Sequence, residues 1–428
     1  MRLAYISADP GVPVFGRKGC SVHVQEVIRA MRGLGVEVDL FATRVGGDPP
    51  ADLADVPLHE LPPVPKGDLA SREQAALAAN TVLTRELDRH GPFDLVYERY
   101  ALWSYAGMFA AREAGVPGVL EVNAPLIDEQ AEHRGLLNRD AALMVAQNAF
   151  SAASVVVAVS DEVANYIRRF DVDPANVHVV PNGVNITRFA PGQPASLPAD
   201  PGVFTVGFVG TLKPWHGLPS LVEAFDLLHQ HAPLTRLLIA GDGGERERIE
   251  ADLAARGLAD AAHFTGSVDP SDIPGLLASM DVAVAPYPDN PNFYFSPLKV
   301  YEYMAAGVPV VASRIGQLAG LIDDGVNGLF CPPEDPNALA DALDRLRHDV
   351  ILRERLALAG RETVVCGKSW DAVARRVLEL ACVRKPLPNP SPARRGALDS
   401  VQRKAPLLAG EGLGRGFRTL EHSETAGV

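Results

Sequence analysis

Residues 286–313 hold the densest set of side chains that could do chemistry. Their sequence is PYPDNPNFYFSPLKVYEYMAAGVPVVAS, which predicts a strand ending in aromatic residues and then a helix opened by a Ser-Pro pair at Ser296. Lys299 and Glu302 lie one turn apart in this helix. The amides of Leu298 and Lys299, with the lysine side chain, would form an anion site, and Glu302 could accept both hydroxyl groups of a ribose. An exposed i, i+3 ion pair explains the spacing equally well.

A second candidate loop lies near the start of the second half of the chain, in residues 207–225. The sequence GFVGTLKPWHGLPSLVEAF predicts a strand that ends at Gly210 and a helix that begins near Gly217. Lys213 and His216 fall in the connecting loop, at the carboxyl end of the strand, where open α/β sheets bind ligands. A lysine there could neutralise a diphosphate. A lysine that is merely solvated is the alternative interpretation.

The turn after the first predicted strand is the third candidate. It reads DPGVPVFGRKGCSVHVQEVIRAM, in which Gly16 and Gly19 bracket two cations and an amphipathic helix begins near Ser21. Helix amides at such an N-terminus favour an anion or a sugar hydroxyl; a surface loop with a serine N-cap fits equally well. The GxGxxG spacing of a dinucleotide site is absent, which argues against an NAD-dependent oxidoreductase.

Strands and helices alternate almost from end to end, which is typical of parallel α/β sheets. Each half also contains a helix that ends at Gly, then Val-Pro, then a buried strand, in AREAGVPGVLEV and EYMAAGVPVVAS. Both halves are therefore predicted to be Rossmann-like. The strands are predicted at residues 3–7, 37–42, 94–98, 118–122, 154–159, 178–180, 204–209, 236–240, 263–265, 282–286, 309–312 and 328–330.

The segment FAPGQPASLPADPG, residues 189–202, is rich in Pro, Ala and Gly and lacks periodicity, so we expect a linker. It separates a first domain, 1–188, from a second domain, 203–368. A helical pattern follows at 369–383. The remainder, 386–428, is rich in Pro, Gly, Arg and Ser and is predicted to be a disordered tail. Its GEGLGRG segment misses the spacing of a phosphate loop.

Composition and charge exclude several classes of protein. The chain has 428 residues, which suggests two or three domains, and a net charge of −13, which argues against a broad nucleic-acid surface. Its four cysteines are scattered, so free thiols in a reducing compartment are expected. The uncharged run at 141–160 contains polar residues and is predicted to be a buried helix and strand rather than a membrane span. We expect a cytoplasmic protein without a signal peptide, for which peripheral contact with the inner face of the membrane stays open.

The chain resembles family 4 glycosyltransferases over roughly residues 1–382. The segments that carry the resemblance are VVAVSDEVANYIRR, VVPNGVNITRF, GFVGTLKPWHG, AGDGGERERIE and SPLKVYEYMAAGVPVVAS. They occur in the order and at the separations expected of that family. PNGV followed by RF and a linker is characteristic of its passage between two domains.

The resemblance implies the GT-B fold, two Rossmann-like domains that face each other across a cleft, with the 369–383 helix crossing back onto the first domain. It implies a retaining transfer from a nucleotide-diphosphate sugar, UDP- or GDP-linked, held by the second domain. No cofactor or metal is needed, because helix dipoles and cations stabilise the leaving diphosphate. Glu302 matches the glutamate that binds the donor ribose. The loop near the base and ribose matches Gly241, Asp242 and Gly243.

Three positions in the second domain depart from the family pattern. The first glutamate of its E-x7-E motif, a contact to sugar hydroxyls, falls on Tyr294, and the usual Arg and Lys of the diphosphate loop fall on Thr211 and His216. The donor cations must therefore be supplied by other residues, of which Lys213 and Lys299 are the best candidates. These changes could also mark a member with a different donor, or one that has lost activity.

In the first domain, the histidine often found after the fourth strand is replaced by Asn123, which cannot act as a base. A front-face mechanism in which the departing phosphate takes the acceptor proton does not require one. A sugar-nucleotide epimerase on the same fold is the alternative activity, and Asp128, Glu129 and His133 could supply its acid and base. The loop at 124–139 contains no motif that identifies the acceptor. A glycan, a lipid-linked sugar, a small metabolite and a protein all stay open. The Asp171 and Asp173 pair resembles a metal-binding DxD but is interpreted as part of a turn.

Overall fold

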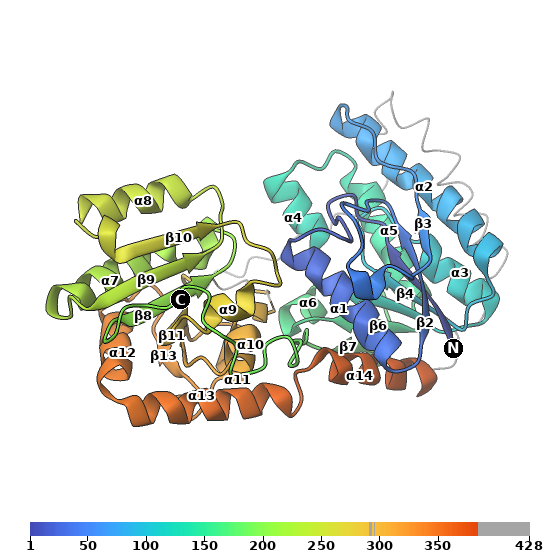
Figure 1. Cartoon of the computed structure of the whole chain (residues 1–428). Coiled ribbons are helices and arrows are strands. Elements are labelled where there is room, and N and C mark those ends of the chain that lie inside the picture. Colours follow the sequence, from blue (N-terminus) through green and yellow to red (C-terminus); the bar gives the residue numbers. More distant parts are fainter. Residues whose placement is uncertain (291–292, 295, 384–428) are drawn as a thin grey trace, which may run out of the picture.

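Two parallel β-sheets, each covered by helices, organise the chain (Figure 1). The computed structural model describes residues 1–290, 293–294 and 296–383. The predicted tail at 386–428, with its GEGLGRG segment, lies outside these residues. The strand orders are β3-β2-β1-β4-β5-β6-β7 and β10-β9-β8-β11-β12-β13. Both orders reverse direction beside the first strand of the sheet, as in doubly wound nucleotide-binding folds, so the predicted pair of Rossmann-like α/β domains is confirmed.

The first sheet is built from strands whose apolar residues are buried on both faces. Residues 155–158, for example, read VVVA and are all buried, as expected for a parallel sheet covered by helices on both sides. The elements of this domain are β1 (Arg2–Ser7), α1 (Gly19–Gly33), β2 (Glu37–Ala42), β3 (Leu58–Glu60), α2 (Leu69–His90), β4 (Leu95–Arg99), α3 (Ala106–Ala114), β5 (Gly118–Val122), α4 (Leu126–His133), α5 (Arg139–Ala152), β6 (Val155–Ala158), α6 (Asp161–Ile167) and β7 (Val177–Val179).

The second sheet has the same character. Its central strands β8 and β11 are buried along their whole length. The elements are β8 (Phe204–Val209), α7 (Leu218–His231), β9 (Thr235–Ala240), α8 (Arg246–Ala255), β10 (Ala262–Gly266), α9 (Ile273–Leu277), β11 (Val282–Ala285), α10 (Leu298–Ala305), β12 (Val310–Ser313), α11 (Leu318–Leu321), β13 (Leu329–Cys331), α12 (Pro336–His348) and α13 (Val350–Val365).

The last described helix, α14 (Trp370–Val383), returns to the first domain (Figure 1). It packs against α1, and the Trp370 ring lies edge-on to the His23 imidazole, with their centroids 5.0 Å apart. Its start is tied to the passage between the domains, since the amide of Val184 donates to the carbonyl of Lys368 over 2.8 Å. Two chain segments therefore connect the domains side by side.

Several local predictions differ from the structure. Helix α1 begins at Gly19, with Lys18 at its N-cap and no side-chain cap, so Ser21 lies inside the helix rather than at its start. The short strand β3 was not predicted.

Other local predictions agree with the structure. The uncharged run at 141–160 forms α5 and β6 as expected, and no helix among the described residues has the length and apolarity to cross a membrane. Asp173 caps a short 3-10 helix by accepting from the amide of Ala175 over 2.9 Å, so the turn interpretation is confirmed.

Candidate functional site

The Lys299 ammonium lies at the carboxyl end of β8, in an enclosed site without a hydrogen-bond partner. Its Nζ atom is shielded from solvent and donates no hydrogen bond to any described residue. The atom lies 4.2 Å from the centroid of the Phe208 ring and 5.3 Å from that of Tyr287. Burial lowers the pKa of Lys299 to about 7, partly opposed by the charge of Glu302. A buried cation without an anion is costly, so this site is suited to a negatively charged ligand.

Two loops at the carboxyl ends of β8 and β9 pack backbone to backbone beside this lysine. The amide of Leu212 donates to the carbonyl of Asp242 over 3.0 Å. A Cβ atom on Gly241 would lie 2.0 Å from the carbonyl oxygen of Gly210, and one on Gly243 would lie 2.4 Å from that of Leu212. Side chains are therefore excluded at these glycines. The Asp242 carboxylate accepts from the amide of Gly243 over 2.8 Å.

His216 is a neutral hydrogen-bonding group in this structure. Its Nδ1 atom lies 2.5 Å from the carbonyl oxygen of Thr211, and because a carbonyl can only accept, Nδ1 carries the proton. Burial, followed by the charges of Lys299 and Lys213, lowers the pKa of His216 to about 3. Its Nε2 atom is thus an acceptor, so His216 cannot replace the missing cation. Lys213 is half-buried and lies over the Trp215 ring, with Nζ 5.7 Å from the centroid.

Glu302 is held on the next turn of α10 and faces charges from the first domain. Burial raises the pKa of Glu302 to about 7; the Arg188 charge opposes this shift and the Glu26 charge adds to it. Arg188 itself pairs with Glu26 of α1 across 3.3 Å. The amide of Leu298 donates to the carbonyl of Ser296 over 2.9 Å. Of the two amides predicted to bind an anion, that of Leu298 is thus already engaged.

The carboxyl edges of the two sheets face each other through a few polar contacts. The Tyr294 hydroxyl donates to the Glu129 carboxylate on α4, and the Gln317 side chain donates to the carbonyl of Val159. The Arg17 guanidinium lies 3.4 Å from the Asp269 carboxylate. The ring of Tyr294 also packs against the apolar core of the first domain. Tyr294, predicted as a donor contact, therefore binds the opposite domain here.

On the first-domain side, Gly16 and Gly19 flank the start of α1. A Cβ atom on Gly16 would lie 2.8 Å from Pro13 and from Ser21, whereas one on Gly19 would meet nothing within 4 Å. Asn123 directly follows β5, and its Nδ2 atom is buried without a hydrogen-bond partner among the described residues. Burial raises the pKa of the nearby Glu121, but the charges of His23 and Arg99 and the contact with the His23 ring hold it below the usual value. Asn123 thus lies two residues after an ionised, buried carboxylate.

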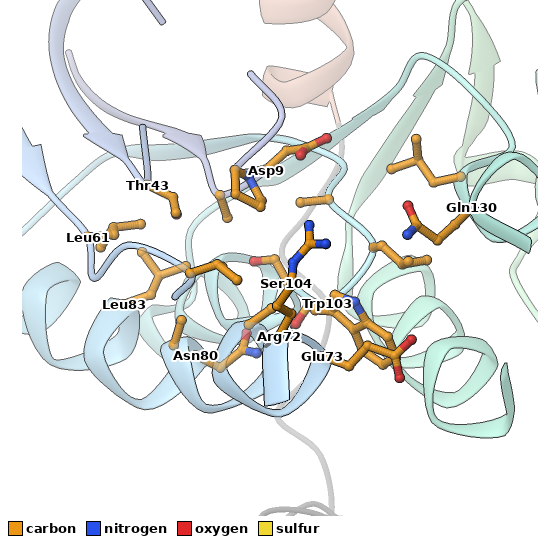
Figure 2. A pocket seen from close by; sticks show the side chains of 18 of the residues that line it. Asp9, Thr43, Leu61, Arg72, Glu73, Asn80, Leu83, Trp103, Ser104 and Gln130 are labelled. Atoms are coloured by element: carbon orange, nitrogen blue, oxygen red, sulfur yellow. Dashed lines mark hydrogen bonds between the residues drawn. The ribbon is translucent and has the colours of Figure 1, made fainter. Parts of the chain in front are cut away.

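A cavity of about 100 Å³ lies between α2, α4 and the carboxyl ends of β1 and β4 (Figure 2). Arg72 projects from α2 into it, and Gln130 faces it from α4. Arg134 also lines the cavity, and neither guanidinium pairs with another residue in the described part of the chain. Glu73 is already satisfied, because its two oxygens accept from the amides of Leu137 and Asn138 over 2.9 and 3.0 Å. The cavity therefore offers cationic groups to a ligand.

Two family models match the two halves of the chain. Residues 17–188 match the model described as Glycosyltransferase Family 4, and residues 203–349 match Glycosyl transferases group 1. A D-inositol 3-phosphate glycosyltransferase of Salinispora arenicola is 30% identical over 393 residues, which cover 85% of this chain and 86% of that protein. The chain belongs to glycosyltransferase family 4. The resemblance noted in the sequence is confirmed, and the protein is a transferase.

Other relatives of this family 4 glycosyltransferase carry the same name. One from Frankia alni is 29% identical over 388 residues, 84% of this chain and 93% of the relative. Among solved structures, the sucrose-phosphate synthase of Thermosynechococcus elongatus aligns with a TM-score of 0.67 at 24% identity, over 89% and 98% of the two chains. HepE of Anabaena, solved in complex with UDP and glucose, aligns with a TM-score of 0.65 at 20% identity, over 90% and 100%. These neighbours establish the GT-B fold.

Some residues of the glycosyltransferase site were not found from the sequence. Arg188 and Glu26 lie beside Glu302, although no motif joins α1 to the domain passage. Glu129 was considered only as part of an epimerase acid–base pair. Its neighbour Asp128 pairs with Arg169 over 2.9 Å and with Arg139 over 3.4 Å.

Proposed function

We propose that this glycosyltransferase moves a hexose from a nucleotide-diphosphate sugar, UDP- or GDP-linked, to an acceptor that carries an anionic group. The main support for a nucleotide-diphosphate donor is the ammonium of Lys299, which is buried without a hydrogen-bond partner among the described residues. It lies at the N-terminal end of α10, so the helix dipole and the lysine would act on the same diphosphate. Glu302, one turn further along, is suited to the ribose hydroxyls. The solved complex of HepE with UDP is consistent with such a donor.

The proposal of an anionic acceptor is based on the cavity between α2 and α4. Arg72 and Arg134 would bind an anionic group, and the relatives named D-inositol 3-phosphate glycosyltransferase point to a phosphorylated polyol. The cavity lies at the carboxyl ends of β1 and β4, and α4, which forms one of its walls, contacts Tyr294 of the second domain. We infer that the acceptor hydroxyl would extend from this cavity toward the donor sugar.

We propose a front-face transfer with retention and without a resident metal ion. The bond between the sugar and the β-phosphate oxygen breaks, and the acceptor oxygen bonds to the same face of the sugar. The departing diphosphate takes the acceptor proton, so Asn123 need not act as a base. Lys299, Lys213 and the first turn of α10 stabilise the charge that develops on the leaving diphosphate.

The first experiment is calorimetric titration with UDP, GDP, ADP and TDP in the presence of EDTA, repeated on Lys299→Ala. Tight binding of one diphosphate that the variant weakens supports the donor site. Absence of binding to all four would favour an inactive homologue, which the tyrosine at position 294 also suggests. A chelator-dependent loss of binding would contradict the metal-free proposal.

Product analysis then tests the reaction, with D-inositol 3-phosphate as the acceptor probe and the sugar nucleotide of the preferred base. Transfer releases the nucleoside diphosphate only when acceptor is present. A new sugar nucleotide formed without acceptor would indicate an epimerase. The anomeric configuration of the product, read by NMR coupling constants, decides between retention and inversion.

A further inference from the structure

Three consecutive residues of α4 point to three different partners. Asp128 pairs with Arg139 and Arg169 of its own domain, Glu129 accepts from Tyr294 of the second domain, and Gln130 lines the cavity of Figure 2. Successive residues of an α-helix are rotated by about 100° from one another, so one short helix can serve all three. Helix α4 is thus both a wall of the cavity and the point of contact with the donor domain.

The contact with the donor domain is well defined on both sides. The Tyr294 ring packs against the core of the first domain, and its hydroxyl donates to the Glu129 carboxylate. Burial raises the pKa of Tyr294 well above its usual value, and Glu129 adds to this shift. The phenol therefore stays protonated and remains a donor throughout the neutral range. A hydrogen bond to a charged acceptor is stronger than one between neutral groups.

Moving α4 would change the cavity directly. Leu126, Gln130 and the C-cap residue Arg134 all line the cavity from this helix. With only eight residues, α4 has few intrahelical hydrogen bonds to fix it. Its position is therefore set mainly by tertiary contacts, and the Tyr294 hydroxyl supplies one of them from the second domain.

We propose that Glu129 is a positioning residue: the Tyr294 hydroxyl of the donor domain holds α4 through Glu129 and so shapes the acceptor cavity for transfer. The inference rests on the proposed function of that cavity as the acceptor site. It assigns Tyr294 a role in acceptor use, in place of the contact with donor-sugar hydroxyls that the family pattern implies at this position.

The test compares Tyr294→Phe, which keeps the ring and removes the hydroxyl, with Glu129→Ala. Each should raise the KM for D-inositol 3-phosphate about tenfold, the loss expected for one hydrogen bond to a charged group. The Kd for the nucleoside diphosphate should stay within about twofold. The double variant should be no worse than either single variant, because both remove the same bond. Glu129→Gln, whose amide oxygen can still accept from Tyr294, should restore most of the acceptor affinity.

Gln317→Ala is the matched control, since it removes another hydrogen bond between the domains that does not touch α4. It should leave the acceptor KM unchanged. An unchanged acceptor KM in Tyr294→Phe, additive effects in the double variant, or an equal loss in Gln317→Ala would overturn the proposal.

Hydrogen exchange of the unliganded protein provides a readout that needs no substrate. Tyr294→Phe should increase the exchange of amides in α4, whereas Gln317→Ala should not. If the unaltered enzyme fails to use D-inositol 3-phosphate, the proposed acceptor is wrong, and the exchange result still decides whether Tyr294 holds α4. Unchanged exchange in Tyr294→Phe would overturn the inference even if the transfer reaction proceeds.

Discussion

At the scale of single residues, the environment of Lys299 dominates the chemistry of the donor domain. Two aromatic rings, 4.2 and 5.3 Å from its Nζ, attract the cation but supply no hydrogen bond. Burial lowers the pKa of Lys299 to about 7, so the amine is partly deprotonated at neutral pH until an anion arrives. Binding of a diphosphate would restore the charged form.

This predicts a pH-dependent affinity for the nucleoside diphosphate. Below pH 7 Lys299 is already protonated, whereas above pH 7 binding requires proton uptake, so the affinity should fall by up to about tenfold per pH unit. Calorimetry between pH 6.5 and 8.5 measures this slope. Lys299→Met should bind at least about tenfold more weakly at pH 6.5 and should lose the decline above pH 7. An identical slope in the variant would assign the titration to another group.

Glu302 is expected to recognise the ribose of the donor. Replacing it by alanine should cost about 1.5–3 kcal/mol of donor binding, roughly ten- to a hundredfold in Kd. A 2′,3′-dideoxy nucleoside diphosphate supplies the control, because it lacks the hydroxyls that Glu302 would accept. The unaltered protein should discriminate against this analogue and Glu302→Ala should not. Equal discrimination by both proteins would show that Glu302 binds something else.

At the scale of elements, the carboxyl ends of parallel strands decide where the site forms. Loops after β8 and β9 meet where Gly241 packs against Gly210 and Gly243 packs against Leu212, and the backbones approach so closely that a side chain fits at neither Gly241 nor Gly243. Gly241 also has a φ of 144°, which residues with a side chain rarely adopt. The β8 loop brings His216 close enough to Lys299 for the lysine charge to lower the pKa of the imidazole.

Gly241→Ala should therefore disturb both stability and donor binding. Its Cβ would lie 2.0 Å from the carbonyl oxygen of Gly210, so the two loops must separate, and we expect a loss of unfolding free energy above about 1 kcal/mol. Gly244→Ala is the matched control, since its Cβ meets nothing within 4 Å. Chemical denaturation and nucleotide titration of both variants provide the comparison. Weaker binding in Gly244→Ala alone would contradict the expectation.

At the scale of the whole molecule, the two domains are joined twice. The chain passes from the first sheet to the second, and α14 then returns to cover α1. Three large side chains of α14, Trp370, Val377 and Leu380, are buried in the core of the first domain. The first domain is therefore completed by residues that come last in the described part of the chain.

Two truncations test this arrangement. A chain that ends after Lys385 keeps α14 and should retain folding, nucleotide binding and turnover. A chain that ends at Ser369 exposes the α1 face and should lose at least about 5 kcal/mol of stability, given about 1.5–3 kcal/mol for each large apolar side chain. That loss is comparable to the total stability of many domains. Thermal unfolding of both chains gives the measurement; cooperative folding of the shorter one would show that α14 is dispensable.

The sequence by itself determined the class of fold, the family and most of the elements. Every predicted strand is present, because runs such as VVVA in β6 and LLIA in β9 are apolar and β-branched enough to be recognised locally. The three residues of β3, Leu-His-Glu, are not fully buried and carry no such pattern, so this strand forms only because β2 is beside it. Lys299 and Glu302 could be selected because both fall within one helical turn.

Tertiary structure alone decided the partners of these residues. Tyr294 and Glu129 are 165 positions apart, and Asn185 and Glu26 are 159 apart; no local preference links them. The low pKa values of Lys299 and His216 arise from burial, which depends on how the β8 loop, α10 and β11 pack together. Secondary structure follows from short-range preferences along the chain, whereas the charges and hydrogen bonds of a site between two sheets depend on which distant side chains the fold brings within a few ångströms.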